Sequence, residues 1–350
     1  GWTMFFAISS GAVATLAVAA SGYFTQLVPL GDMGRRVVAV GMIVIIAAVN
    51  VRGTRHGAEV VNWATAIKVG AILVMSAVLI GRGAPSEPAW ERPWPDAFSL
   101  SLLSGAGVAM IGVLWAYEGW QYVTFSAGEA VDPQRTFPRA LIAGTLALVG
   151  IYLLANVAYI AAMGPRAAAA SEAVAADAVR LVVGPVAGKL IAAAIIISMF
   201  SAANSITLTS PRVYFAMARD GLFFRQLAEI HPRFGTPAIA VMASSAWAAL
   251  LALSGTFEQL LTYVVFAGWI FYGLGAWSVF VYRRRQPDLP RPFRVPGYPW
   301  TPILFILSAV AIVVNTLFAQ PVQGLLGLGV LFLGAPAYLI WRKRGGVTAP

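Results

Sequence analysis

The stretch that decides the fold is LLSGAGVAMIGVLWAYEGWQYVTFSA, residues 102–127. It is long and apolar enough to cross a bilayer as one helix, which takes about 20 residues. Its second half, however, places a carboxylate and a glycine, Glu118 and Gly119, between aromatic residues. Backbone that unwinds at membrane depth is tolerated only where it lines a cavity or is buried in protein. The stretch therefore predicts a membrane helix that is interrupted at a cavity, with an intact helix and a paired Glu118 as the alternative.

The rest of the chain has the composition of a membrane protein. Of its 350 residues 59% are hydrophobic and 11% are charged, whereas a soluble domain carries about 25% charged residues. The sequence therefore predicts an all-α integral membrane protein with about ten transmembrane helices. The predicted apolar segments are residues 2–28, 36–51, 59–81, 102–127, 139–163, 186–210, 236–254, 259–282, 300–319 and 322–341.

The positive charges predict an orientation in the membrane. The formal net charge is +10, and 16 of the 24 Lys and Arg residues lie in the C-terminus and in alternate loops, those that follow segments 36–51, 102–127, 186–210 and 259–282. Seven lie in the opposite loops or at the segment ends beside them, and Lys68 lies well inside a segment. Because Lys and Arg accumulate in cytoplasmic loops, the C-terminus is expected in the cytoplasm. The basic excess thus has an explanation other than nucleic-acid binding, and contact with membrane lipid is expected instead.

Several kinds of site are excluded by residue type. The chain has no cysteine, so it has no disulfide, thiolate zinc site, iron-sulfur cluster or cysteine nucleophile. The only histidines, His56 and His231, lie far apart in the sequence and form no metal-binding motif. A membrane-embedded enzyme would need a cluster such as paired carboxylates, and none is present in the apolar segments. We expect no catalytic residue, no metal and no cofactor.

Two groups of polar residues lie inside other apolar segments. Lys68 is in segment 59–81, where an ammonium usually faces a protein interior or a water pathway. Its long side chain can alternatively reach the membrane interface. Segment 186–210 carries a polar stripe that includes Ser201, Asn204 and Ser205. Hydroxyl residues commonly hydrogen-bond between membrane helices, and Asn204 is the member of the stripe that is expected to face a cavity.

Together, three motifs give the sequence a resemblance to a known family. The first is Trp115 to Trp120 with the following loop, which contains Asp132-Pro133 and Pro138-Arg139. The others are the segment Arg212 to Gly221 and the segment Pro290 to Pro299. In their order and topology they resemble the amino acid-polyamine-organocation transporters, most closely the L-type amino acid transporter branch. The resemblance covers nearly the whole chain.

This resemblance implies a LeuT-like fold of five plus five helices in inverted repeat, followed by two accessory helices. Segment 102–127 is then helix six and segment 2–28 is helix three, so the chain is expected to lack helices one and two and to begin inside a larger protein. Residues 1–81 would be the remainder of the first repeat with helices three to five. Residues 102–282 would be the second repeat with helices six to ten, and residues 297–341 the accessory helices eleven and twelve.

The resemblance also implies roles for individual residues. Trp115 matches an aromatic gate, Trp120 an aromatic wall, and the backbone carbonyls of Ala116 and Glu118 the groups that receive the substrate ammonium. Lys68 matches a lysine that takes the place of a sodium ion in sodium-driven relatives, with Ser201 and Ser205 as its expected partners. The predicted substrate-binding residues are Trp115, Ala116, Tyr117, Glu118, Gly119, Trp120 and Asn204, and the predicted coupling residues are Lys68, Ser201 and Ser205.

The function expected from these features is secondary active transport of small neutral amino acids by alternating access, as a permease or exchanger in a prokaryotic inner membrane. A cationic amino acid or polyamine transporter is the alternative within the class. It would require an acidic pocket, for which Glu118 is the only acid in the interior of the apolar segments, since Glu59 stands at the very start of segment 59–81. A non-transporting fragment or scaffold is the alternative outside the class.

Overall fold

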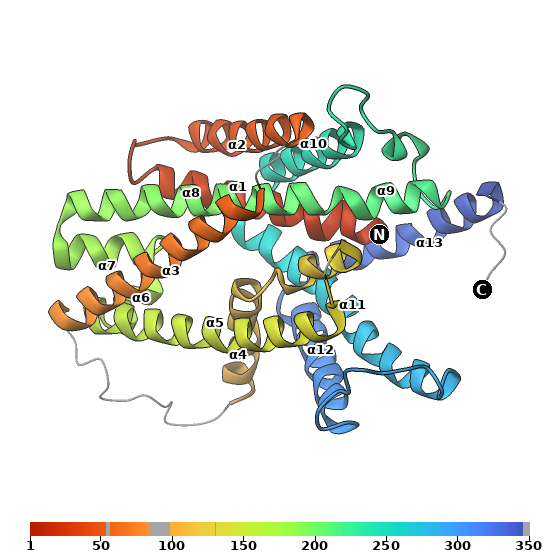
Figure 1. Cartoon of the computed structure of the whole chain (residues 1–350). Helices are drawn as coiled ribbons and strands as arrows, with labels where there is room; N and C mark the ends of the chain where they lie inside the picture. The colour runs from red at the N-terminus through yellow and green to blue at the C-terminus, as the bar shows by residue number, and fades with distance from the viewer. Residues whose placement is uncertain (54–56, 84–98, 130, 346–350) are drawn as a thin grey trace.

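The computed structural model describes residues 1–53, 57–83, 99–129 and 131–345, and every regular element in this part of the chain is a helix (Figure 1). The elements are, in chain order, η1 (Met4–Ser9), α1 (Ser10–Phe24), α2 (Asp32–Arg52), α3 (Gly57–Arg82), α4 (Leu100–Ala116), η2 (Trp120–Glu129), α5 (Pro133–Met163), α6 (Pro165–Ala170), α7 (Val174–Val183), α8 (Pro185–Thr209), α9 (Pro211–Arg219), η3 (Arg225–Ala228), α10 (Ala238–Ser254), α11 (Phe257–Arg285), α12 (Trp300–Ala319) and α13 (Pro321–Gly345).

The helices confirm an all-helical, multi-pass membrane protein. Among the described residues, nine helical stretches are long and apolar enough to cross a bilayer. The remaining predicted segment, residues 236–254, forms α10, which has 17 residues and is shorter than these nine spans. Most of the connection between the predicted segments 59–81 and 102–127 lies outside the described residues.

Local sequence signals set the helix boundaries. At the start of α4, the side chain of Ser99 accepts a hydrogen bond from the backbone N–H of Leu102 at 3.1 Å. At the start of α11, Thr256 and Gln259 form a reciprocal capping box, which satisfies two backbone donors that the first turn leaves free. Gly184 ends α7 with φ at +119°, a backbone conformation that glycine adopts without strain.

Helix α1 lies at the centre of the larger core, where it packs against α2, α8 and α10. Figure 1 shows α2 and α10 together on one side of α1 and α8. Ala14 and Ala17 of α1 and Ala203 of α8 are completely buried at these contacts. Small side chains let the helix backbones approach closely, which is how membrane helices gain packing energy without a hydrophobic driving force.

A second core joins α3, α5 and α7 around Leu79, Ala158 and Ala178, which are all completely buried. In Figure 1, α4 and α12 run at a steep angle to α5 and α8. Helix α4 packs against both α11 and α12. This contact places the C-terminal end of α4, where the interruption was predicted, beside α11.

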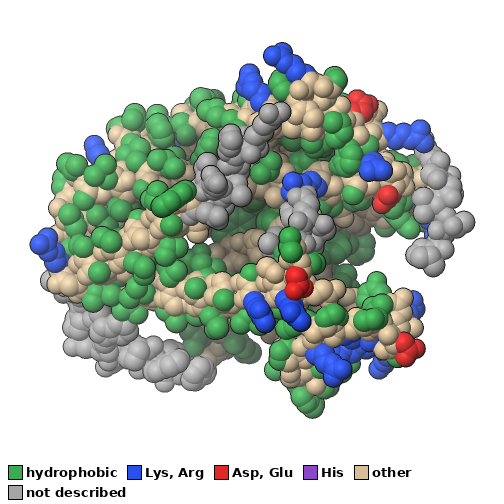
Figure 2. Space-filling model, viewed as in Figure 1, with side chains coloured by type: hydrophobic (Ala, Val, Ile, Leu, Met, Phe, Trp, Pro, Cys, Tyr) green, Lys and Arg blue, Asp and Glu red, His purple; other side chains and the backbone are tan. Residues whose placement is uncertain are grey.

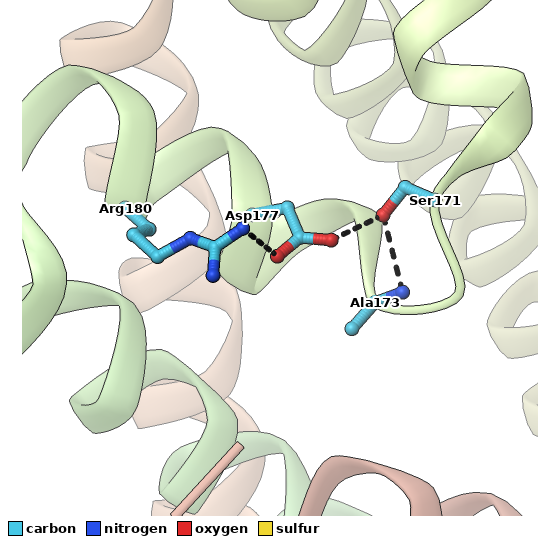
Figure 3. Close-up of polar contacts among 4 residues, drawn as sticks. All are labelled: Ser171, Ala173, Asp177 and Arg180. Atoms are coloured by element: carbon cyan, nitrogen blue, oxygen red, sulfur yellow. Dashed lines mark hydrogen bonds and ion pairs between the residues drawn. The ribbon is translucent and has the colours of Figure 1, made fainter. Parts of the chain in front are cut away.

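The short helices α6 and α7 lie between two predicted segments and were not foreseen. Ser171 fixes the turn between them, because its hydroxyl accepts from the backbone N–H of Ala173 at 3.2 Å and donates to Asp177 at 2.6 Å (Figure 3). Asp177 also forms an ion pair with Arg180 at 3.0 Å. Hydropathy did not reveal these helices because each is shorter than a membrane span and α7 carries two charges.

The outer surface suits a lipid environment. Figure 2 shows hydrophobic side chains over much of the visible face, with Lys and Arg in small groups among them. Leu146 of α5, Ile197 of α8 and Phe318 of α12 are among the large apolar side chains that are more than half exposed. An apolar surface of this extent would be a liability in water and is expected where the solvent is lipid.

Candidate functional site

The predicted interruption is present in the backbone. Helix α4 ends at Ala116, and Tyr117 leaves the helical conformation with φ −94° and ψ 2°. Gly119 has φ at +123°, in a region that residues with a side chain rarely adopt. A 3-10 helix, η2, then begins at Trp120, and the backbone N–H of Tyr122 donates to the carbonyl of Gly119 at 3.1 Å. The alternative of an intact helix through residues 115 to 120 is therefore wrong.

The carboxylate of Glu118 is held by two side-chain donors. Gln121 donates from Nε2 to Oε1 of Glu118 at 2.6 Å, and the hydroxyl of Tyr272, on α11, donates to the same oxygen. The amide oxygen of Gln121 in turn accepts from the backbone N–H of Gly119 at 3.1 Å. The half-buried carboxylate thus ties the interruption to α11, and hydrogen bonds to a charged group are stronger than neutral ones.

Aromatic side chains surround the interruption. The ring centroids of Trp120 and Tyr272 are 5.3 Å apart, and those of Tyr117 and Tyr152, on α5, are 5.1 Å apart. Trp115 packs against buried side chains of α4 and α11. The six predicted residues from Trp115 to Trp120 are contiguous in the sequence, and the side chains that α5 and α11 contribute complete the site around them.

Two of the backbone carbonyls at the interruption already have partners. The carbonyl of Trp115 accepts from the backbone N–H of Glu118 at 3.0 Å. The carbonyl of Ala116 accepts from the hydroxyl of Tyr152 at 3.0 Å. A ligand ammonium at Ala116 would therefore share or replace the Tyr152 contact.

Lys68 points from α3 toward α8. Its Nζ lies 3.5 Å from the backbone carbonyl oxygen of Ser198, at the limit of a hydrogen bond. The two expected partners are on the same helix, where the hydroxyl of Ser205 donates to the backbone carbonyl of Ser201 at 3.0 Å. The structure thus brings Lys68 to α8, where its ammonium contacts a backbone carbonyl and neither predicted hydroxyl.

Asn204 faces α2 in this structure. Its Oδ1 accepts a hydrogen bond of 2.8 Å from Nδ2 of Asn50, which also donates to the carbonyl of Ile46 at 2.9 Å. Asn204 therefore lies at a contact between α2 and α8, and its role in binding stays a prediction. Within the described residues, no group of three or more His, Cys, Asp or Glu side chains is placed to hold a metal ion.

Sequence reasoning missed four residues that contact the predicted ones, namely Asn50, Gln121, Tyr152 and Tyr272. Gln121 directly follows the motif and was the one most open to prediction. Tyr152 and Tyr272 each lie in the middle of an apolar segment, where a tyrosine hydroxyl needs a partner. That need could have been predicted, but the identity of the partner could not.

Comparisons with known proteins bear on the family of the chain. A family model described as Amino acid permease matches residues 1–333. The chain is 30% identical over 322 residues to "Large neutral amino acids transporter small subunit 2" of Oryctolagus cuniculus, an alignment that covers 89% of the chain and 59% of that protein. It is 27% identical over 348 residues to "Serine/threonine exchanger SteT" of Bacillus subtilis (98% and 78%). It is 30% identical over 282 residues to "b(0,+)-type amino acid transporter 1" of Rattus norvegicus (79% and 56%).

Proposed function

The chain belongs to the amino acid permease family, and we propose that it is part of a secondary active transporter for small neutral amino acids that works by alternating access. It spans less than two thirds of the length of the rabbit relative described above. The observation that carries the proposal is the interruption between α4 and η2, where a membrane-spanning helix opens among aromatic side chains. Interrupted helices of this kind form substrate sites in many secondary transporters.

The preference for neutral substrates rests on Glu118. Both side-chain donors that reach its carboxylate, Gln121 and Tyr272, belong to the protein. Asp32 and Glu258 lie in the first turns of α2 and α11, and Glu258 is thus at the opposite end of the α11 stretch that leads to Tyr272. A cationic side chain or a polyamine would have to displace protein donors from the acid at this site. A neutral amino acid needs only partners for its ammonium and carboxylate groups.

The helix packing supports the proposed inverted repeat of five plus five helices. If η1 with α1 is helix three, then α8 is helix eight, its counterpart in the second repeat, and these two helices pack against each other. The proposed counterparts α2 and α10 also pack together. Residues 1–81, 102–282 and 297–341 would then be the remainder of the first repeat, the second repeat and the accessory helices.

Reconstitution tests the proposal. The full-length protein in proteoliposomes is expected to take up labelled alanine or serine, with competition by other small neutral amino acids and little by arginine or putrescine. Uptake that no amino acid competes with would reject the proposal, and competition by arginine or putrescine would favour the cationic alternative. Dependence on internal amino acid would identify an exchanger, and dependence on a pH gradient a proton-coupled permease.

Lys68 is the proposed coupling residue, because its ammonium reaches from α3 to a backbone carbonyl of α8. Lys68→Ala is expected to abolish transport in the same assay while the protein still folds. Lys189, exposed near the start of α8, supplies a matched control, and Lys189→Ala should transport normally. Normal activity of Lys68→Ala would leave only the interpretation in which the side chain reaches the membrane interface. The proposed location is a cell inner membrane with the C-terminus in the cytoplasm.

A further inference from the structure

Many buried hydroxyl groups on the described helices donate to a carbonyl one turn earlier. Thr15 donates to Gly11 at 2.8 Å, Thr207 to Ala203 at 2.9 Å and Ser244 to Ala240 at 2.9 Å. This local bond is the usual way for a helical Ser or Thr to satisfy its hydroxyl. The hydroxyls that depart from it are therefore informative.

Within the described chain, five buried side-chain hydroxyls have no hydrogen-bond partner, and four of them lie close together. The residues of this hydroxyl cluster are Ser9, Ser10, Ser210 and Tyr122. The three serines line a single small cavity between η1, α1, α8, α9 and α10. The hydroxyls of Tyr122, from η2, and Tyr214, from α9, lie near those of Ser9 and Ser210, but none of these pairs has the geometry of a full hydrogen bond. Such groups are rarely left unsatisfied in a folded protein, because a buried polar atom without a partner is costly.

The local backbone explains why Ser10 does not bond within its own helix. The carbonyl one turn before Ser10 is that of Phe6, which already accepts from Nε1 of Trp247 at 2.8 Å and from the hydroxyl of Tyr263 at 3.5 Å. Residues Met4–Ser9 form a π-helix, so the path into α1 is also wider than an α-helix. The side chains of α10 and α11 have thus taken the acceptor that Ser10 would otherwise use.

The size and chemistry of the cavity indicate its occupant. Its volume is about 10 Å³, which is close to the space that one water molecule requires. The polar residues that line it are uncharged, namely Ser9, Ser10, Thr207, Ser210, Tyr214, Ser244 and Ser245. A cation would have to give up its hydration shell without meeting a compensating negative charge. A water molecule can donate to and accept from the three serine hydroxyls at once.

We propose that the hydroxyl cluster is a binding site for one ordered water molecule, which bridges α1 and α8 through Ser9, Ser10 and Ser210. The hydroxyl of Tyr122 extends this site to η2, the segment that follows the interruption. The site does not depend on which substrate the protein carries, since none of its residues is among those predicted to bind substrate. It holds together three elements that are distant in the sequence.

The experiment compares the thermal unfolding of the full-length protein with that of Ser210→Ala and Ser244→Ala. If water occupies the cavity, Ser210→Ala removes one hydrogen-bond partner of that water, and the midpoint temperature of thermal unfolding should fall by about 2 °C. If the cavity is dry, the same change removes an unsatisfied polar group, and the midpoint should rise, which would overturn the proposal. Ser244 lines the same cavity but has its own carbonyl partner, so Ser244→Ala should shift the midpoint less than Ser210→Ala.

A double variant and a change of the buffer cation complete the test. Because Ser9 and Ser210 would share one water molecule, Ser9→Ala with Ser210→Ala should lower the midpoint by less than the sum of the single changes, and strict additivity would contradict the shared water. Replacing sodium by choline should leave the midpoint unchanged, whereas a sodium-specific rise that disappears in Ser210→Ala would reassign the cavity to a cation. An experimental structure that resolves ordered water should show one peak here, and an empty cavity would overturn the proposal.

Discussion

The backbone departs from α-helical geometry at two places that carry polar groups, and these places satisfy them differently. At the interruption after Ala116, side chains of the protein supply the partners, with Gln121 and Tyr272 at Glu118 and Tyr152 at the carbonyl of Ala116. At the π-helix Met4–Ser9, the neighbouring hydroxyls face a cavity and have no protein partner. The polar groups of the first place are joined to other helices by direct hydrogen bonds. At the second, direct bonds from α10 and α11 reach the carbonyl of Phe6, but the serine hydroxyls are joined to other elements by a proposed water molecule.

The largest expected effect is that of Gly119→Leu. A Cβ at this position would meet no other atom within 4 Å, so the obstacle is the backbone conformation and not space. A side chain at φ +123° costs on the order of 1–3 kcal/mol, which favours closing the helix or moving η2. We expect transport in proteoliposomes to fall by about 100-fold, as small displacements of positioning groups can do.

Two matched glycines serve as controls for this change. Gly112 also has open space for a side chain, but its φ is not positive, so Gly112→Leu should keep most of the activity. Gly184 has a similar φ of +119° between α7 and α8, so Gly184→Leu introduces strain away from the interruption. Equal losses of transport in Gly119→Leu and Gly184→Leu would show that the effect is general strain, against our account.

An intermediate effect is expected for Tyr272→Phe, which removes the hydroxyl that reaches Glu118 from α11. Because the partner is a carboxylate, the free energy of unfolding should fall by about 1.5–3 kcal/mol. The measurement is denaturant unfolding of the purified protein in detergent. Glu118→Gln in the Tyr272→Phe background should then restore part of the lost stability, because a missing hydrogen-bond donor costs a neutral amide less free energy than it costs a carboxylate. An unchanged stability in Tyr272→Phe would mean that the α11 contact does not hold the interruption.

The smallest effect is expected for Tyr122→Phe, the same chemical change in the hydroxyl cluster. Its proposed partner is a neutral water, so the free energy of unfolding should fall by only about 0.5–1 kcal/mol. The ratio of the two Tyr→Phe effects therefore measures the difference between the two places in one assay. A loss for Tyr122→Phe as large as that for Tyr272→Phe would contradict the proposed distinction.

The sequence predicted the parts of the fold that depend on local pattern. Segment 300–319 matches Trp300–Ala319, and segment 59–81 differs from Gly57–Arg82 by one or two residues at each end, because apolar length alone defines a span. The interruption was predictable because Glu118 and Gly119 are unusual neighbours inside an apolar helix. Helices α6 and α7 were not predicted, because a hydropathy pattern does not separate short helices from a loop.

The contacts that complete the site were beyond the sequence. Tyr272 is 154 positions away from Glu118, and no local pattern relates the two. The same holds for Lys68, whose contact with the carbonyl of Ser198 involves a backbone atom, which any residue could supply. The π-helix at Met4–Ser9 depends on tertiary contacts such as that of Trp247 with Phe6, and the hydroxyl cluster follows from it.

The central claim is that an amino acid binds at the interruption, and cysteine labelling at Ala116 tests it most directly. The chain contains no cysteine, so Ala116→Cys introduces a single thiol into it at an exposed position. Saturating alanine or serine should slow labelling by a water-soluble thiol reagent at least several-fold. The same amino acids should not affect Ala216→Cys on α9. Labelling of Ala116→Cys that substrate does not slow, in a variant that still transports, would contradict the account.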